Sequence, residues 1–162
     1  MNPIVNFTDF LETVPAFAEF GAAELAVLEQ AMVVEQYPDE YVFIGEERRG
    51  ENMFVVVEGE VVATHKRLKM RGIDVIERLG PGDLFGLVEL IDHRYAWATY
   101  RAVGQVTVAS LPAAAFELLF TAHTPIAHHF QRLIALQLAR DLRTCIQDLV
   151  ASFAKGATTD DN

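Results

Sequence analysis

Glycines divide the middle of the chain into short segments, and their spacing limits the folds that the chain can adopt. Eight of the chain's 10 glycines lie between Tyr41 and Leu111, and the segments between them are rich in Val, Ile and Phe. Short β-branched and aromatic runs that end at turn residues are typical of β-strands. The strand-like segments are residues 41–44, 53–57, 60–65, 73–78, 97–103 and 105–111. Their number and spacing predict a small β-sandwich or barrel over residues 41–111.

The segments on either side of this region have the period of helices. Over residues 9–34 apolar side chains recur at helical spacing and Gly21 interrupts them, which predicts two short helices within residues 1–40. Residues 112–154 return to this period, with a short helix expected over 113–120 and a long one over 125–153. Residues 155–162 are polar and predict a disordered tail. The expected fold is a single domain of the α+β class, mainly β.

Two apolar stripes run along the predicted long helix. The first consists of Ile126, Phe130 and Leu133 and stops at the polar Gln137. At 1.5 Å per residue the helix is about 42 Å long, so it should extend past a domain of this size. The second stripe is therefore available to pack on another chain, although packing on the barrel of the same chain is an alternative. Its members are Ile134, Leu138, Leu142, Cys145, Ile146, Leu149 and Phe153.

The charge balance argues against a nucleic-acid partner. The 162 residues carry a formal net charge of −10, and an acidic surface repels a polyanion such as DNA. Cys145 is the one cysteine, which excludes an intramolecular disulfide and suits a reducing compartment. The chain has no basic start followed by an apolar run, and no apolar stretch of about eighteen residues. We therefore expect a cytoplasmic protein with no signal peptide and no membrane span.

Three stretches of the sequence together resemble the cyclic-nucleotide-binding domain family, which includes catabolite-activator-type regulators, kinase regulatory subunits and cyclic-nucleotide-gated channels. The first is GENMFVVVEGEV at residues 50–61, and the second is LGPGDLFG at residues 79–86. The third combines VPAF at residues 14–17 with AEL at residues 23–25. The resemblance implies a β-roll or jelly-roll barrel flanked by N-terminal helices and a long C-terminal helix. It also implies a phosphate-binding cassette over residues 80–99.

The family's cassette holds a cyclic phosphate at the start of a short helix, whose free N–H groups favour negative charge. The resemblance assigns this role to the backbone of Gly86, Leu87 and Val88. Two side chains complete the family's site, a glutamate that accepts from the ribose and an arginine that pairs with the phosphate. An ungapped alignment places Leu87 and Ala96 at these two positions, and neither side chain has the required chemistry.

A shortened alignment offers substitutes for the missing side chains. It moves Arg94 into the phosphate role, while Glu89 reaches the ribose only if the helix shifts by about half a turn. Each residue also has a plainer interpretation: Arg94 as a solvated side chain at a hairpin apex, and Glu89 as a surface charge or a partner of Arg94. Trp97 and Tyr100 point to opposite faces of a strand, so one of them should be in the core, and either is a candidate to cover a ligand.

The sequence predicts no catalytic site and no metal site. The histidines before and inside the long helix (His123, His128 and His129) do not share one helix face, and the strands and loops add only His65 and His93. Neither serine, Ser110 or Ser152, has the glycine-flanked turn of a nucleophile. Cys145 is expected to be a buried structural thiol.

These observations favour a non-enzymatic regulatory module, for which two hypotheses remain. In one, the cassette binds a cyclic nucleotide or another phosphorylated small molecule with weak or altered affinity. In the other, the domain is a ligand-free scaffold for protein–protein interaction. No DNA-binding output domain is expected after Phe153, so the signal should pass to an effector protein that the sequence does not name. By resemblance, the long helix is the seam of a homodimer, with Leu138, Leu142, Cys145, Ile146 and Leu149 facing the second copy.

Overall fold

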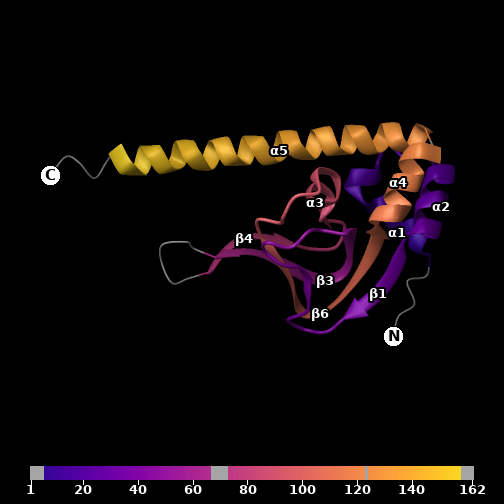
Figure 1. Ribbon diagram of the computed structural model, residues 1–162, viewed down its shortest axis with the longest axis horizontal. Helices are drawn as coiled ribbons and strands as arrows, with labels where there is room; N and C mark the ends of the chain where they lie inside the picture. Colours follow the sequence, from indigo (N-terminus) through magenta and orange to yellow (C-terminus); the bar gives the residue numbers. More distant parts are fainter. Residues whose placement is uncertain (1–5, 67–72, 123, 158–162) are drawn as a thin grey trace.

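A computed structural model describes residues 6–66, 73–122 and 124–157 of the chain. Three short helical elements lead into an antiparallel sheet, and two helices follow it (Figure 1). The leading elements are α1 (Phe7–Thr13), the 3-10 turn η1 (Pro15–Phe17) and α2 (Ala22–Ala31). The closing helices are α4 (Ala113–Ala122) and α5 (Thr124–Ala157), and α5 runs along the whole molecule and beyond it. This arrangement confirms the predicted class, mainly β with helices at both ends.

The sheet is a curved, antiparallel array around the two longest strands. Its strands are β1 (Val33–Tyr37), β2 (Val42–Ile44), β3 (Asn52–Lys66), β4 (Ile73–Leu79), β5 (Leu84–Phe85) and β6 (Thr99–Pro112). The order along the sheet is β1-β6-β3-β4, while β2 also pairs with β6 and β5 with β3. The short helix α3 (Leu87–Asp92) lies between β5 and β6 in the chain. We call β5 and α3 with the loop that follows it (residues 84–98) the flap. It packs against β3, with which β5 pairs.

The strand pattern was predicted only in part. The expected segments 53–57 and 60–65 form one strand, β3, because the chain bulges around Glu58 and the ladder then continues. The segments 97–103 and 105–111 similarly fall into β6, apart from Trp97 and Ala98, which precede it. Residues 1–40 were expected to be helical, and this was wrong for β1, which pairs with β6 from Val33 to Tyr37.

Two apolar clusters fill the interior. The larger joins the helices to the sheet and contains Phe17, Leu28, Leu87, Leu111 and Phe130, among others. The smaller fills the β-roll. Its aromatic rings pack in sequence, with Phe54 stacked on Phe85 (centroids 4.8 Å apart) and Phe85 on Tyr100 (5.2 Å). The flap contributes side chains to both clusters: Leu87 and Leu90 belong to the larger one, and Phe85 and Ala96 to the smaller one. The cassette is therefore supported by both.

The two ends of α5 differ in their environment. Ile126, Phe130 and Leu133 are buried, as expected for the first stripe. His129 and Arg132 face the N-terminal helices, with His129 Nδ1 3.1 Å from Glu24 Oε2 and Arg132 Nη2 2.8 Å from Glu19 Oε1. From Leu138 to Phe153, every residue whose burial is described is exposed.

Ile134, the first member of the second stripe, packs against the larger cluster of the same chain. From Leu138 onward the stripe does not pack on the barrel, so for this part of it that alternative is wrong. The expectation that Cys145 is buried is also wrong, because this thiol is exposed. Helix α5 continues to Ala157, so residues 155–157, predicted as tail, are helical. The rest of the predicted tail, residues 158–162, lies outside the described residues. In the part of the chain that the structure describes, no helix is long and apolar enough to span a bilayer.

Candidate ligand-binding cassette

The chain reaches the cassette through a turn that is fixed by hydrogen bonds. We call residues 79–86 the approach turn. Within it, the Gly80 N–H donates to Asp83 Oδ2 (2.8 Å) and the Asp83 N–H to the Gly80 carbonyl (3.0 Å). The turn is joined to β3 by two bonds, from the Gly82 N–H to the Val56 carbonyl (2.8 Å) and from the Val56 N–H to the Asp83 carbonyl (3.0 Å). The approach turn is thus held almost entirely by its backbone.

Gly86 ends this turn and caps α3. Its φ of +79° lies in the left-handed region that favours glycine. A Cβ here would lie 2.5 Å from the Asn52 carbonyl oxygen and 2.9 Å from Ile44 Cδ1. Both the backbone conformation and the close approach of β3 therefore require glycine. The Gly86 carbonyl accepts from the Leu90 N–H (3.1 Å), and this bond starts α3.

The two positions that the resemblance assigns to charged side chains are closed and apolar. The Leu87 side chain is 5 % exposed and packs in the larger cluster, and Ala96 is 3 % exposed and packs in the smaller one. The Ala96 backbone is also occupied, because its N–H donates to the Arg48 carbonyl (2.8 Å) and its carbonyl accepts from the Glu47 N–H (2.9 Å). The structure thus provides neither a carboxylate nor a guanidinium at these positions.

Glu89 is buried, which contradicts its interpretation as a surface charge. It is 5 % exposed, and a Cβ at Gly50 would lie only 2.6 Å from the Glu89 Cβ. Burial raises the pKa of the Glu89 carboxyl above its ordinary value, and the nearby Asp92 charge adds to this rise. The same environment that packs α3 against the loop before β3 therefore favours the neutral acid.

Arg94 lies on the surface in the loop that follows α3. We call residues 92–98 the exit loop. The Arg94 N–H donates to Asp92 Oδ1 (2.9 Å), and His93 turns the chain with a φ of 55°. Among the described residues its guanidinium has no ion pair, with Glu89 or with any other carboxylate. Arg94 is therefore exposed and free to meet an anion, but it lies in a helix-ending turn and not at the expected hairpin apex.

The exit loop alternates between buried and exposed side chains. Ala96 and Ala98 point into the β-roll, whereas Tyr95 is 66 % exposed and Trp97 is 61 % exposed. The Arg49 guanidinium lies over the Tyr95 ring, 5.8 Å from its centroid. Tyr100 is half-buried against Phe85, so of the two rings expected near the ligand, Tyr100 packs in the core and Trp97 faces solvent.

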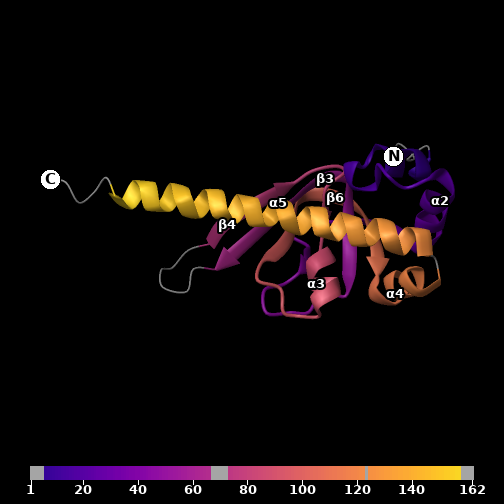
Figure 2. The ribbon, with the colours of Figure 1, turned by 90° about the horizontal axis from the view of Figure 1, so that it is seen from above.

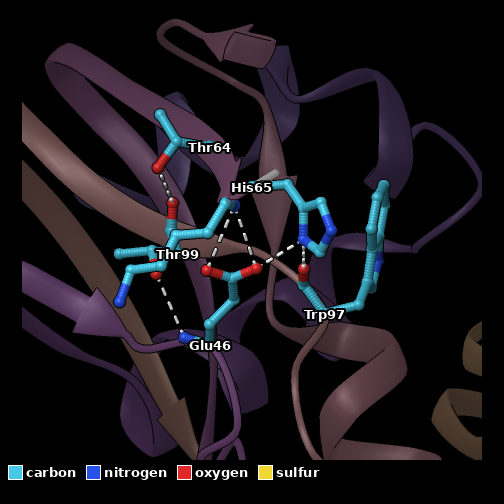
Figure 3. A network of polar contacts seen from close by, with 6 residues as sticks. Glu46, Thr64, His65, Trp97 and Thr99 are labelled. Atoms are coloured by element: carbon cyan, nitrogen blue, oxygen red, sulfur yellow. Dashed lines mark hydrogen bonds and ion pairs between the residues drawn. The ribbon is translucent and has the colours of Figure 1, made fainter. Parts of the chain in front are cut away.

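A polar network anchors the exit loop to β3 (Figure 3). His65 Nδ1 lies 2.6 Å from the Trp97 carbonyl oxygen and also contacts Glu46 Oε1. Because both partners are acceptors, Nδ1 carries the proton. The Glu46 carboxylate further accepts from the Lys66 N–H (3.2 Å), and the Glu46 N–H donates to Thr99 Oγ1 (3.1 Å). The His65 ring lies beside the Trp97 indole, with centroids 5.9 Å apart.

The sequence analysis did not predict this network, although one feature of the sequence could have indicated it. Glu46, His65 and Trp97 are far apart in the chain, and only the pairing of β3 with β6 brings the last two together. The signal was His65 itself, an isolated imidazole at the end of a strand. Of the other histidines, His123 lies outside the described residues. Within the ranges that the structure describes, no group of three or more His, Cys, Asp or Glu side chains is placed to hold a metal ion.

Comparison with known proteins identifies this architecture. Residues 34–123 match the family model described as cyclic nucleotide-binding domain. A cAMP-dependent protein kinase regulatory subunit of Mycosarcoma maydis is 31 % identical over 105 residues, which is 65 % of this chain and 20 % of that protein. The chain spans between 20 % and 31 % of the length of the curated relatives it matches.

Two solved structures are informative. A cyclic nucleotide-binding domain from Methylobacillus flagellatus has a TM-score of 0.78 at 19 % identity and covers 90 % of this chain and 81 % of its own. The second is a regulatory subunit of a cAMP-independent protein kinase A from Trypanosoma brucei, a triple mutant bound to cAMP in its A site (TM-score 0.64, 20 % identity, 80 % of this chain and 50 % of that one). Because the family model matches more than half of its residues, the chain belongs to the cyclic nucleotide-binding domain family.

Proposed function

We propose that this chain is a non-enzymatic regulatory domain that binds a phosphorylated small molecule with weak or altered affinity for cyclic nucleotides. The observation that carries the proposal is the burial of Leu87 and Ala96 at the positions of the family's glutamate and arginine. Removing one partner of a buried, hydrogen-bonded charge pair typically costs about 2–5 kcal/mol of binding free energy. Cyclic AMP should therefore bind this cassette much more weakly than it binds a cassette with both side chains.

The Trypanosoma brucei structure supports this interpretation. The protein kinase A to which that subunit belongs is described as cAMP-independent, and the subunit variant bound to cAMP carries three substitutions, one of which introduces an arginine. A domain of this fold can thus keep its architecture without depending on cAMP. We propose that the present chain is in a similar state because it lacks the same kind of cationic side chain.

The groups that remain for a ligand are the backbone at the start of α3 and one cation. We propose that the N–H groups of Gly86, Leu87 and Val88 donate to the phosphate. Helix α3 has only six residues, so its free N–H groups contribute more than any helix dipole. Arg94 is exposed and has no ion pair among the described residues, which makes it the available counter-charge. Glu89 is buried against Gly50, so it meets a ribose only if α3 moves.

A titration of the purified protein tests the proposal. Cyclic AMP, cyclic GMP and cyclic di-GMP are added in turn, and binding is followed by calorimetry and by the fluorescence of Trp97, the one tryptophan. A ligand that binds the folded state also raises the melting temperature. Saturable binding of one nucleotide, weakened by Arg94→Ala and unchanged in the surface control Arg101→Ala, supports the proposal. Binding that is unchanged in Arg94→Ala refutes the role of that residue.

The alternative function is a ligand-free interaction scaffold. The burial of Leu87 and Ala96 favours it, since both side chains are taken up by packing in the apolar clusters. No response to any of the three nucleotides selects this alternative. An effector protein and a cytoplasmic location remain predictions from the sequence.

We also propose that the exposed part of α5 pairs with a second copy of the chain. A helix in a protein gains most of its stability from packing of its apolar face, and the apolar side chains of this segment, including Leu142 at 62 % exposed, have no cover among the described residues of the chain. Leu138, Leu142, Cys145 and Leu149 recur at intervals of four, three and four, which is the seam of a two-stranded coiled coil. Ile146 borders this seam. A second copy of the chain has the same exposed stripe, so the two stripes can cover each other in a symmetric pair.

Sedimentation tests this pairing. Leu142→Asp should convert a dimer into a monomer, because a charge replaces an apolar residue in the seam. Gln147→Asp places the same charge on the opposite face of α5 and serves as the control. A mass of one chain in the unmodified protein refutes the pairing, and so does a dimer that persists in Leu142→Asp.

A further inference from the structure

A cavity of about 340 Å³ lies where α3, α4 and α5 meet. In both ribbon views α3 and α4 lie on the same side of the first half of α5 (Figure 1 and Figure 2). The residues that line it come from all three helices: Leu90, Ile91, Ala113, Phe116, Phe120 and Ile134 are apolar, and His93, Glu117 and Gln131 are polar. Its size is at the lower end of the range for small-molecule sites.

This cavity is separate from the cassette's phosphate position. The proposed phosphate donors lie at the first turn of α3, beside Gly86. The cavity instead contacts the last turn, through Leu90, Ile91 and His93. A helix of six residues is about 9 Å long, so the two positions are at opposite ends of α3. A ligand in the cavity does not need the cassette to be functional.

The inner wall of the cavity is apolar and aromatic. Leu90 and Phe116 are buried, and the rings of Phe116 and Phe120 lie with centroids 4.8 Å apart. Apolar surface of this kind is stabilised when an apolar group displaces water from it. The wall therefore fits a compact hydrocarbon body, such as one or two fused rings.

The rim carries the charge that selects the ligand. Glu117 is the one carboxylate among the lining residues, and it has no ion pair among the residues that the structure describes. It lies on α4 next to Phe116 in the chain, and Phe116 and Phe120 line the same cavity; aromatic ring faces attract cations. The protein as a whole carries a net charge of −10, which adds to the attraction of a cation. His93 and Gln131 provide further polar contacts on the other two helices.

We propose that this cavity binds a small organic amine, with its apolar body between Phe116, Phe120, Leu90 and Ile134 and its ammonium group at Glu117. Such a ligand bridges the end of the cassette helix and the start of α5. It therefore stabilises one position of α3 relative to α5, and it acts independently of any nucleotide.

Three probes of the same shape test the proposal. These are 2-naphthylmethylamine, 2-naphthylmethanol and 2-naphthoate, which are cationic, neutral and anionic at neutral pH. Calorimetry on the full chain should show saturable binding of the amine, weaker binding of the alcohol and the weakest binding of the carboxylate. Equal affinities for all three, or no binding of the amine, would overturn the proposal.

Variants locate the site. Ala113→Leu fills the cavity and should lower the affinity for the amine by about tenfold or more. Ala114→Leu is the matched control, because Ala114 is exposed on the same helix and does not line the cavity. If Ala113→Leu does not fold, Gln131→Phe fills the cavity from α5. Amine binding that is unchanged in the cavity-filling variant refutes the location.

The charge at the rim has its own test. Glu117→Gln should weaken binding of the amine by about three- to fivefold, as expected for the loss of an exposed ion pair, and leave the affinity for the alcohol unchanged. An equal loss for both probes contradicts the assignment of Glu117 to the ammonium group. Arg94→Ala should leave amine binding unchanged, so failure of the nucleotide proposal and failure of this one are distinguishable.

Discussion

The approach turn and the exit loop bound the same cassette, but they are held in place by different groups. Backbone hydrogen bonds and Gly86 fix the approach turn against β3. The exit loop relies more on side chains, with Glu46 and His65 holding Trp97 and Thr99 from outside. The approach turn carries the stretch that resembles the family's sequence pattern, whereas the ungapped alignment predicts Ala96 of the exit loop in the position of the arginine.

This difference shows which part of a binding domain can change without loss of the fold. The approach turn organises the sheet whether or not a ligand is present, so its residues are constrained by folding. The charged side chains of a binding site contribute mainly when a ligand is bound. We predict that Leu87 and Ala96 replace them in this chain, and both side chains pack in the two cores. Substitutions at the two ends of the cassette should therefore affect different properties.

The largest effect is expected at Gly86. Gly86→Ala places a methyl group 2.5 Å from the Asn52 carbonyl oxygen at a φ of +79°, and it should lower the free energy of unfolding by about 2–4 kcal/mol. Gly104→Ala is the control, because Gly104 has a φ of +69° but open space around its Cβ position. It should cost about 1 kcal/mol. Urea unfolding measures both, and equal losses would mean that the contact with Asn52 has no effect.

Rebuilding the family's two side chains, at the start of α3 and in the exit loop, is expected to tighten binding at a cost in stability, because both positions are buried. Leu87→Glu combined with Ala96→Arg should tighten cyclic AMP binding by about tenfold or more, since a charge pair at the phosphate is worth about 2 kcal/mol or more. Leu87→Gln combined with Ala96→Met keeps similar side-chain sizes without the charges and is the control. Calorimetry measures both. A gain of affinity in the uncharged variant would show that packing, and not charge, limits binding.

The approach turn could be predicted from the sequence because the residues that indicate it lie within the turn itself. Gly80, Pro81, Gly82 and Gly86 mark the turn directly, and the structure has the turn there. Local signals also predicted most strands and the long helix. They missed β1, whose residues are mostly exposed and follow α2 without a break, and β5, which has only two residues.

The errors at Glu89, His65 and Cys145 have a different cause. Whether Glu89 is buried depends on the close approach of Gly50, which is distant in the chain, and no pattern around Glu89 indicates it. The partners of His65 likewise come from two other segments, so the network exists only in the folded sheet. Cys145 was predicted to be buried because it lies on an apolar stripe, but an apolar stripe does not show whether its cover belongs to the same chain.

The network around His65 should contribute moderately to stability. Glu46→Ala removes the acceptor of the Lys66 N–H and a partner of His65, and it should lower the free energy of unfolding by about 1–2 kcal/mol. Because the network holds the Trp97 backbone, the fluorescence of Trp97 should also change in the folded state. Glu58→Ala, on an exposed part of β3, is the control for losing a carboxylate. An unchanged fluorescence spectrum would indicate that the exit loop is held without Glu46.

The smallest effect is expected at Glu89, and it depends on pH. Burial raises the pKa of Glu89 in the folded state above the ordinary value of 4.5, so between these two values the folded protein binds more protons than the unfolded chain. Its stability therefore falls as pH rises from about 4.5. Glu89→Gln removes this dependence, and relative to the unmodified protein it should gain stability as pH increases through this window. Urea unfolding at a series of pH values measures the difference, and Glu58→Gln corrects for the loss of one negative charge. If the unmodified protein instead becomes more stable relative to Glu89→Gln as pH rises, the carboxylate has a stabilising partner in the folded state, and the exit side of the cassette is more polar than its packing indicates.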